Sequence, residues 1–139
     1  MARIVLTDAK VTVNGVNLSD HIASITINES VDVVETTAFS STAAKTRVAG
    51  LADHSVTLEF HQDFASSSVE ATINGTSSLV GTVTSIVVQP TSSAVGATNP
   101  TYSFSALVAE WTPLNGSVGE LSTASVTWPI SGAITKAVA

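Results

Sequence analysis

Residues 31–63 read VDVVETTAF (31–39), SSTAAKTRVAGLAD (40–53) and HSVTLEFHQD (54–63), and this stretch decides the fold. The third segment alternates strictly between apolar and polar side chains, as a strand with one buried face does. Its apolar side chains are Val56, Leu58 and Phe60. The first segment alternates less regularly. The sequence therefore predicts two strands of a β-domain, joined by a long loop.

The loop at residues 40–53 is too long for a tight hairpin turn, and it contains Lys45 and Arg47, two of the five basic residues in the chain. Loops of this length without structure of their own are uncommon in compact domains and are usually functional. We therefore predict that the loop docks onto another copy of the protein. The predicted subunit-interface residues are Ser40, Ser41, Thr42, Ala43, Ala44, Lys45, Thr46, Arg47, Val48, Ala49, Gly50 and Leu51.

The composition favours a single all-β domain. The chain has 139 residues, and charged residues make up 12% of it, against roughly 25% in an average soluble domain. The β-branched residues Val and Thr are abundant and suit strands, whereas the helix formers Glu, Lys, Gln and Arg are scarce. The low charge also favours a surface covered by partner subunits over an ordinary neutral surface, because interface cores are depleted of charge.

The net charge of −6, from eleven acids and five bases, argues against a surface that binds nucleic acid. The chain has no cysteine, so the sequence predicts neither disulfides nor thiolate chemistry. The N-terminal sequence MARIVLTDAKVTV lacks the uninterrupted apolar core of a secretion signal. No apolar run approaches ~18 residues, so no membrane span is expected.

Strand patterns recur along the rest of the chain, at residues 10–20, 21–29, 82–90, 101–111 and 121–130. Asn14-Gly15 inside the first of these segments is a strong signal for a hairpin turn. Serines followed by apolar side chains at helical spacing predict one short helix at about residues 67–73. The predicted fold is all-β with this one helix, a β-sandwich or partly open barrel. It is a single domain over residues 1–139 with short terminal arms at 1–9 and 131–139.

The three histidines, His21, His54 and His61, each have an aspartate nearby, as in a metal site or proton relay. However, His54 and His61 are seven positions apart on one strand, and because seven is odd these two side chains point to opposite faces. Glu59 and Asp63 share a face but lie roughly 13 Å apart, beyond the ~5–9.5 Å of a glycosidase pair. The sequence also lacks a nucleophile elbow and a phosphate-binding loop. It predicts no catalytic residue, no metal site, no cofactor and no enzyme.

Two tryptophans, Trp111 and Trp128, follow strand segments near the end of the chain. We predict that they pack in the core or anchor a subunit interface, where aromatic side chains are common. Stacking on a sugar ligand is the alternative.

Three segments resemble the small major tail (tail tube) proteins of long-tailed, siphovirus-type bacteriophages: VNGVNLSDHIASITINESVDVVETTAFSS, TRVAGLADHSVTLEFHQDF and QPTSSAVGATNPTYSFSALVAEW. The resemblance implies homohexameric rings that stack into a tube, with strands of every copy joining one inner β-barrel. It implies that DNA passes through without specific binding, and that the long loop reaches the next subunit or ring. It also implies terminal arms that help to stack the rings, and a location in the virion tail, assembled in the host cytoplasm with other tail proteins.

An acidic lumen suits a DNA conduit, because a basic wall would bind phosphates and stall transit. The polar face of the strand at 54–63 is the candidate wall. The candidate lumen-facing residues are Glu35, Thr57, Glu59, His61 and Asp63.

Three other functions fit the same sequence features. A capsid decoration or cement protein would also be all-β and low in charge. A tail terminator would form a ring without stacking. A carbohydrate-binding β-sandwich is a more remote alternative from a different functional class.

Overall fold

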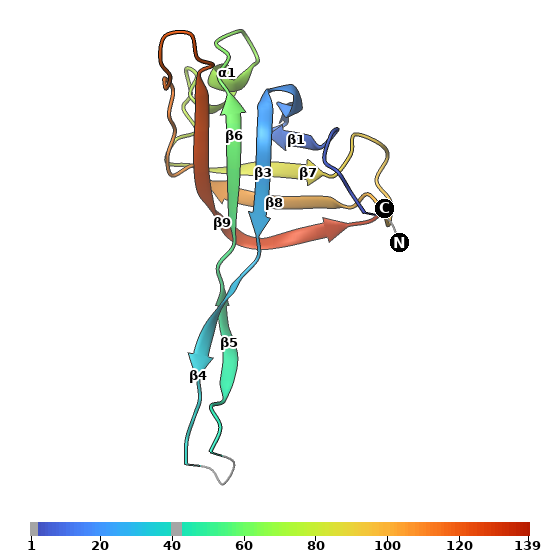
Figure 1. Ribbon diagram of the computed structural model, residues 1–139, viewed down its shortest axis with the longest axis vertical. Coiled ribbons are helices and arrows are strands. Elements are labelled where there is room, and N and C mark those ends of the chain that lie inside the picture. The colour runs from blue at the N-terminus through green and yellow to red at the C-terminus, as the bar shows by residue number, and fades with distance from the viewer. Residues whose placement is uncertain (1–2, 40–42) are drawn as a thin grey trace.

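Seven antiparallel strands form the body of the protein in the computed structural model, which describes residues 3–39 and 43–139 (Figure 1). The strands of the body are β1 (Lys10–Val13), β2 (Val16–Asn17), β3 (Ile22–Asn28), β6 (Ser55–His61), β7 (Val83–Gln89), β8 (Thr101–Leu107) and β9 (Thr123–Ala137). They are hydrogen-bonded in the order β2-β1-β7-β8-β9-β6-β3. The one α-helix among the described residues is α1 (Val69–Ile73), within the range predicted from the sequence. The prediction of an all-β fold with a short helix is confirmed.

The long strand β9 folds the sheet into two layers. Its first half pairs with β6, from Thr123 opposite His61 to Pro129 opposite Ser55. Its second half pairs with β8, ending with Ala137 opposite Thr101. Figure 1 shows β3, β6 and the first half of β9 crossing the direction of β7 and β8. The result is a sandwich-like body, and none of the described strands closes it into a barrel.

The second half of β9 corrects one prediction. The sequence predicts a C-terminal arm from residue 131, but residues 131–137 continue the strand along β8. Gly132 adopts a φ of +95°, which a glycine tolerates, and the register between β8 and β9 shifts at this point. The strand therefore passes from β6 to β8 after Pro129 without leaving the sheet.

The core lies between the two layers and is built from the alternating positions of their strands. Val56, Leu58 and Phe60 of β6 are fully buried, as their spacing predicts. The Phe60 ring lies 6.0 Å from the Trp128 ring and 5.4 Å, edge-on, from the Trp111 ring. Helix α1 closes one end of the sandwich through the buried side chains of Val69 and Ile73.

Asn14-Gly15 forms the predicted turn between β1 and β2. Asn14 has a φ of 50° and Gly15 a φ of +81°, and two positive φ values are what a two-residue turn between right-twisted strands requires. This hairpin, which is predicted from its turn residues, places β2 at one edge of the sheet.

Two further strands, β4 (Val31–Glu35) and β5 (Arg47–Ala52), form a hairpin that projects away from the body (Figure 1). We call this hairpin and its connection, residues 31–52, the arm. The arm prolongs the ribbon formed by β3 and β6, because the Asp53 amide donates to the Ser30 carbonyl at 2.8 Å where the two ribbons join. Residues 40–42 of the connection lie outside the described part.

The arm corrects the prediction for residues 40–53. The sequence predicts a loop there, but residues 47–52 form β5 and pair with β4, from Glu35 opposite Arg47 to Val31 opposite Ala52. The strands at 31–35 and 55–61 are consequently not neighbours in one sheet. Strand β6 lies instead between β3 and β9.

Candidate functional site

The arm exposes six large apolar side chains to solvent. All of its described residues are exposed. They include Val33 at 67%, Leu51 at 81% and Phe39 at 108% relative exposure. An isolated two-stranded hairpin is marginally stable in water, and exposed apolar surface of this kind marks interaction sites. The arm is therefore the candidate interaction surface of the protein.

Contacts within the arm hold its two strands together but do not cover them. The hydroxyls of Thr36 and Thr46 lie 2.8 Å apart across the ribbon, and the Thr46 amide donates to the Thr37 hydroxyl at 3.0 Å. Lys45 Nζ lies 4.0 Å from a Glu35 carboxylate oxygen. An exposed ion pair at this distance contributes little stability, about 0–1 kcal/mol. The ribbon keeps its shape through small polar contacts.

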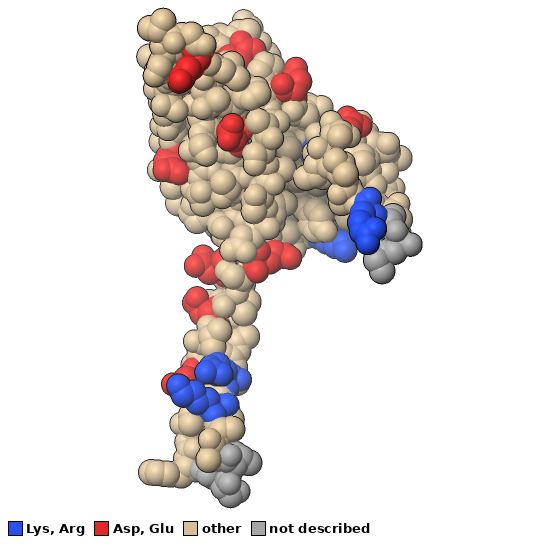
Figure 2. Space-filling view, in the orientation of Figure 1, with Lys and Arg blue, Asp and Glu red and all other residues tan. Residues whose placement is uncertain are grey.

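Charge is segregated along the molecule. Figure 2 shows Lys and Arg side chains in the lower part of the arm and near the chain ends, while Asp and Glu side chains lie over the body and at the root of the arm. The bases of the arm are Lys45 and Arg47, both in the predicted interface segment. The arm also contains Asp32 and Glu35, so it is neutral as a whole. Its two bases lie together near its far end, in a protein with a net charge of −6, and complement an acidic surface.

The outer face of β3, β6 and the first half of β9 is polar. Thr57, Glu59 and His61 lie on this face, opposite the buried positions of β6. The Thr57 and Thr127 hydroxyls are 3.1 Å apart across the β6–β9 pair. The remaining outward positions are uncharged: Ser24, Thr26, Asn28, Ser55, Thr123, Ser125, Thr127 and Pro129. Glu59 is the one formal charge among these described positions, apart from any charge on His61.

Two of the five predicted lumen-facing residues lie elsewhere. Glu35 is on the arm, because β4 leaves the body before this residue. Asp63 follows the end of β6, where the chain turns towards α1. The structure therefore brings Thr57, Glu59 and His61 together, but it separates Glu35 and Asp63 from them.

Asp63 has a structural role instead. Its carboxylate accepts hydrogen bonds from the Ala65 amide at 2.9 Å and the Ser68 hydroxyl at 2.8 Å, and His21 Nε2 lies 2.9 Å away. The other ring nitrogen of His21 lies 2.8 Å from Asp20. These hydrogen bonds, the Ala65 amide first, hold the pKa of Asp63 below its ordinary value. The network ties the turn at 19–21 to the start of α1.

The lowered pKa gives a pH-dependent prediction. A carboxylate with a depressed folded-state pKa stabilises the fold above its unfolded pKa, and the contribution is lost as pH falls through the folded pKa. We expect Asp63→Asn to lower the urea midpoint near pH 7 and to flatten its decline below about pH 4. Urea titrations of both proteins across this range measure the effect. Parallel pH profiles for the two proteins would show that Asp63 does not contribute in this way.

The two predicted interface tryptophans have different environments. Trp128 is fully buried, and its indole N–H donates to the Glu110 carbonyl at 2.8 Å, so it belongs to the core and is not available to a partner. Trp111 is half-buried, and its indole N–H donates to Glu70 at 2.9 Å. The Glu70 carboxylate also accepts a hydrogen bond from the Gln62 side-chain amide at 2.9 Å. Glu70 thus connects two side chains at α1, and no sequence pattern predicts this role.

The described residues contain no group of three or more His, Cys, Asp or Glu side chains that could hold a metal ion. No helix in the described part is long and apolar enough to cross a membrane.

The fold has a counterpart among solved structures. The structure matches a chain in the cryo-EM structure of the anti-feeding prophage (AFP) baseplate, 6-fold symmetrised, with a TM-score of 0.55 and 10% sequence identity. The match covers 98% of this chain and 97% of that chain. Neither a protein-family model nor a curated protein matches the sequence. At this identity the likeness shows a shared fold over the whole length of both chains.

Proposed function

We propose that this protein is a structural component of a phage tail, and that it self-assembles into homohexameric rings that stack into a tail tube for DNA. The observation that carries the proposal is the arm, whose strands leave the body with apolar side chains exposed on both of them. Such a ribbon is suited to burial against another copy of the chain. In this proposal the protein catalyses no reaction and binds no cofactor.

Two independent likenesses support a tail-related role. The sequence segments at about residues 11–128 resemble major tail proteins. The fold is shared with a chain of a prophage baseplate that was analysed with 6-fold symmetry. The low content of charged residues, 12%, fits a subunit that neighbours cover on several sides.

The polar outer face of β3, β6 and β9 is our candidate for the channel wall. Thr57, Glu59 and His61 lie on it among small hydroxyl and amide side chains, and none of its described positions is Lys or Arg. Phosphates bind clusters of basic side chains, so a wall of this composition would let DNA slide without holding it. This face can line a channel for DNA only if the subunits form the ring that we propose.

The two basic residues of the arm give a prediction for assembly. We expect the double variant Lys45→Glu, Arg47→Glu to form few or no assemblies at a concentration where the wild type assembles, because its arm would meet acidic surface with the wrong charge. Raising the salt concentration should weaken wild-type assembly as well. Light scattering measures both effects. The charge-preserving variant Lys45→Arg, Arg47→Lys is the matched control, and equal assembly of both variants would contradict a role for the charges.

A baseplate or terminal ring is the second candidate function, favoured by the likeness of the fold to a chain of a prophage baseplate. A subunit of this kind would close into a ring with the same arm contacts but would not stack into a long tube.

Negative-stain electron microscopy of the purified wild-type protein tests the proposal. Tubes are expected for a tail tube protein, and isolated rings would favour the second candidate. A protein that stays monomeric at every concentration and salt condition tested would contradict both, and would leave a decoration or carbohydrate-binding domain.

A further inference from the structure

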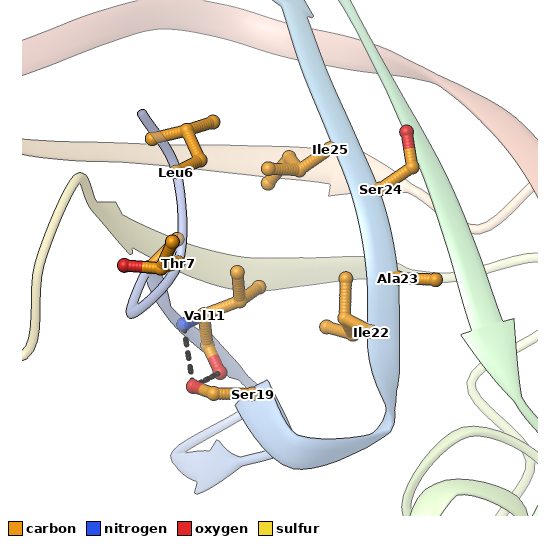
Figure 3. Close-up of a pocket in the computed structure, with 9 residues that line it drawn as sticks. Leu6, Thr7, Val11, Ser19, Ile22, Ala23, Ser24 and Ile25 are labelled. Atoms are coloured by element: carbon orange, nitrogen blue, oxygen red, sulfur yellow. Dashed lines mark hydrogen bonds between the residues drawn. The ribbon is translucent and has the colours of Figure 1, made fainter. Parts of the chain in front are cut away.

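A groove that is apolar over part of its length runs along β3, between this strand and the N-terminal segment. Two adjoining cavities of about 160 Å³ and 130 Å³ share Leu6, Ala9 and Ile25 in their walls. Ile27, Val88 and Tyr102 complete the more apolar of the two. Figure 3 shows Leu6 facing Ile25 across the smaller cavity, while Ser24 points away from it. The groove is thus an opening into the side of the sandwich.

The same groove lies beside an unpaired strand edge. Strand β3 has β6 on one side and, among the described residues, no strand on the other. Its free edge presents backbone N–H and C=O groups, which readily accept another strand. Ile22, Ile25 and Ile27 are only partly buried against the core. An added strand would therefore gain both backbone hydrogen bonds and apolar contacts.

Two lysines lie next to residues that line the groove. Lys136 is opposite Tyr102 in the β8–β9 ladder, and Lys10 is opposite Gln89 in the β1–β7 ladder. Tyr102 and Gln89 both line the groove. Figure 2 shows Lys and Arg side chains gathered near the chain ends, on this side of the body. Neither lysine forms an ion pair within the part of the chain that the structure describes.

The root of the arm has the complementary properties. Asp32 lies within β4, between the exposed side chains of Val31 and Val33, and Glu29 and Asp53 flank the junction with the body. Figure 2 shows acidic side chains gathered there. Among the described residues none of these three carboxylates has an ion-pair partner. The outer edge of β4 is also unpaired, because β5 is its one partner in the described sheet.

We propose that strand β4 of a second copy docks along the β3 edge and fills this groove. The valines of β4 would cover the apolar side chains of the groove, and Asp32 would approach the basic residues at its rim. The two unpaired strand edges would complete one another as an intermolecular sheet. A chain cannot make this contact with itself, because its own arm extends away from its groove (Figure 1).

This inference rests on the proposed self-assembly and names the surfaces that meet. The root of the arm would bind the groove of one neighbour. Lys45 and Arg47, farther along the arm, would make a separate contact with an acidic surface. A symmetric arrangement, in which the same patch meets itself, is not implied, because the donor and acceptor surfaces differ. Such a heterologous contact closes into rings when the rotation per subunit allows it.

Disulfide trapping between two variants tests the contact, since the native chain has no cysteine. One variant carries Val33→Cys in β4 and the other carries Ala9→Cys in the groove. When the two are mixed under assembling conditions and mildly oxidised, we expect a heterodimer band on a non-reducing gel, in several-fold excess over homodimers. The control pairs Val33→Cys with Ser125→Cys, on the outer face of β9, and should give little heterodimer.

A charge exchange gives an independent readout. Lys136→Glu should reduce assembly several-fold, and adding Asp32→Lys in the same chain should restore it. Assemblies that form normally without the Val33–Ala9 cross-link and without sensitivity to Lys136→Glu would overturn the groove contact but leave the tail-tube proposal intact. A wild-type protein that never assembles would overturn the proposed function itself.

Discussion

Removing the arm should produce a folded protein that no longer assembles. In this variant the dipeptide Asn-Gly replaces residues 31–52, so that it links Ser30 to Asp53. These two residues are already paired at the end of the body ribbon, where the Asp53 amide donates to the Ser30 carbonyl at 2.8 Å. A two-residue Asn-Gly turn closes such a pair. Because the arm contributes no residue to the core, we expect a monomer whose unfolding midpoint lies within about 5 °C of the wild-type value, roughly 1 kcal/mol.

Size-exclusion chromatography with light scattering measures the assembly, and circular dichroism measures the unfolding. The control is Val118→Ser, which removes an apolar side chain that is 106% exposed on the body and leaves the arm intact. This control should assemble like the wild type. Tubes or rings formed by the armless variant would show that the assembly contacts lie on the body alone.

Replacing Trp128 by alanine should have the largest effect on stability. Its side chain is fully buried, lies 6.0 Å from the Phe60 ring and donates a hydrogen bond to the Glu110 carbonyl. Buried Trp→Ala substitutions cost about 3–5 kcal/mol, a large share of the roughly 5–15 kcal/mol of a typical domain. We therefore expect a protein that is largely unfolded or aggregated at 37 °C, with a strongly reduced urea midpoint.

Trp128→Phe provides a milder variant in case the alanine variant does not fold. It keeps an aromatic ring but loses the indole N–H, so its urea midpoint should fall between those of the alanine variant and the wild type. Ser125→Ala, at an exposed position of the same strand, should change the midpoint by less than about 0.5 kcal/mol in free energy. If Trp128→Ala unfolded like Ser125→Ala, the assignment of Trp128 to the core would be wrong.

The elements that bury one face could be predicted from the sequence. Strand β6 alternates because Val56, Leu58 and Phe60 enter the core while their neighbours face outwards. The Asn14-Gly15 turn follows from its special backbone angles. Both features depend only on residues within one short segment, so the sequence of that segment is enough to predict them.

The arm could be predicted only in part, because its strands bury neither face. Strand β5 reads RVAGLA, with Gly50 in the middle and no alternation between apolar and polar residues. It is a strand because it pairs with β4, and position 50 suits a glycine because a Cβ there would come within 3.1 Å of Val34 Cγ2. Pairing of this kind depends on the neighbouring strand, which the pattern of residues within β5 does not identify.

The residues of the candidate channel wall could be identified only from the pairing of the strands in the structure. Sequence alternation placed Glu35 and Asp63 with Thr57, Glu59 and His61, because it assumed one continuous sheet. The chain leaves that sheet between β3 and β4 and again after β6, so only the last three residues share a face. The contacts from His21 to Asp63 and from Trp111 to Glu70 join distant segments, so no local sequence pattern predicts them.

A cryo-electron microscopy reconstruction of the assembled wild-type protein tests the central claim most directly. We expect rings in which the arm of each copy is buried against a neighbour. We also expect that the face with Thr57, Glu59 and His61 lines the channel. Assemblies whose arms extend free into solvent, or whose channel is lined by Lys45 and Arg47, would contradict this claim.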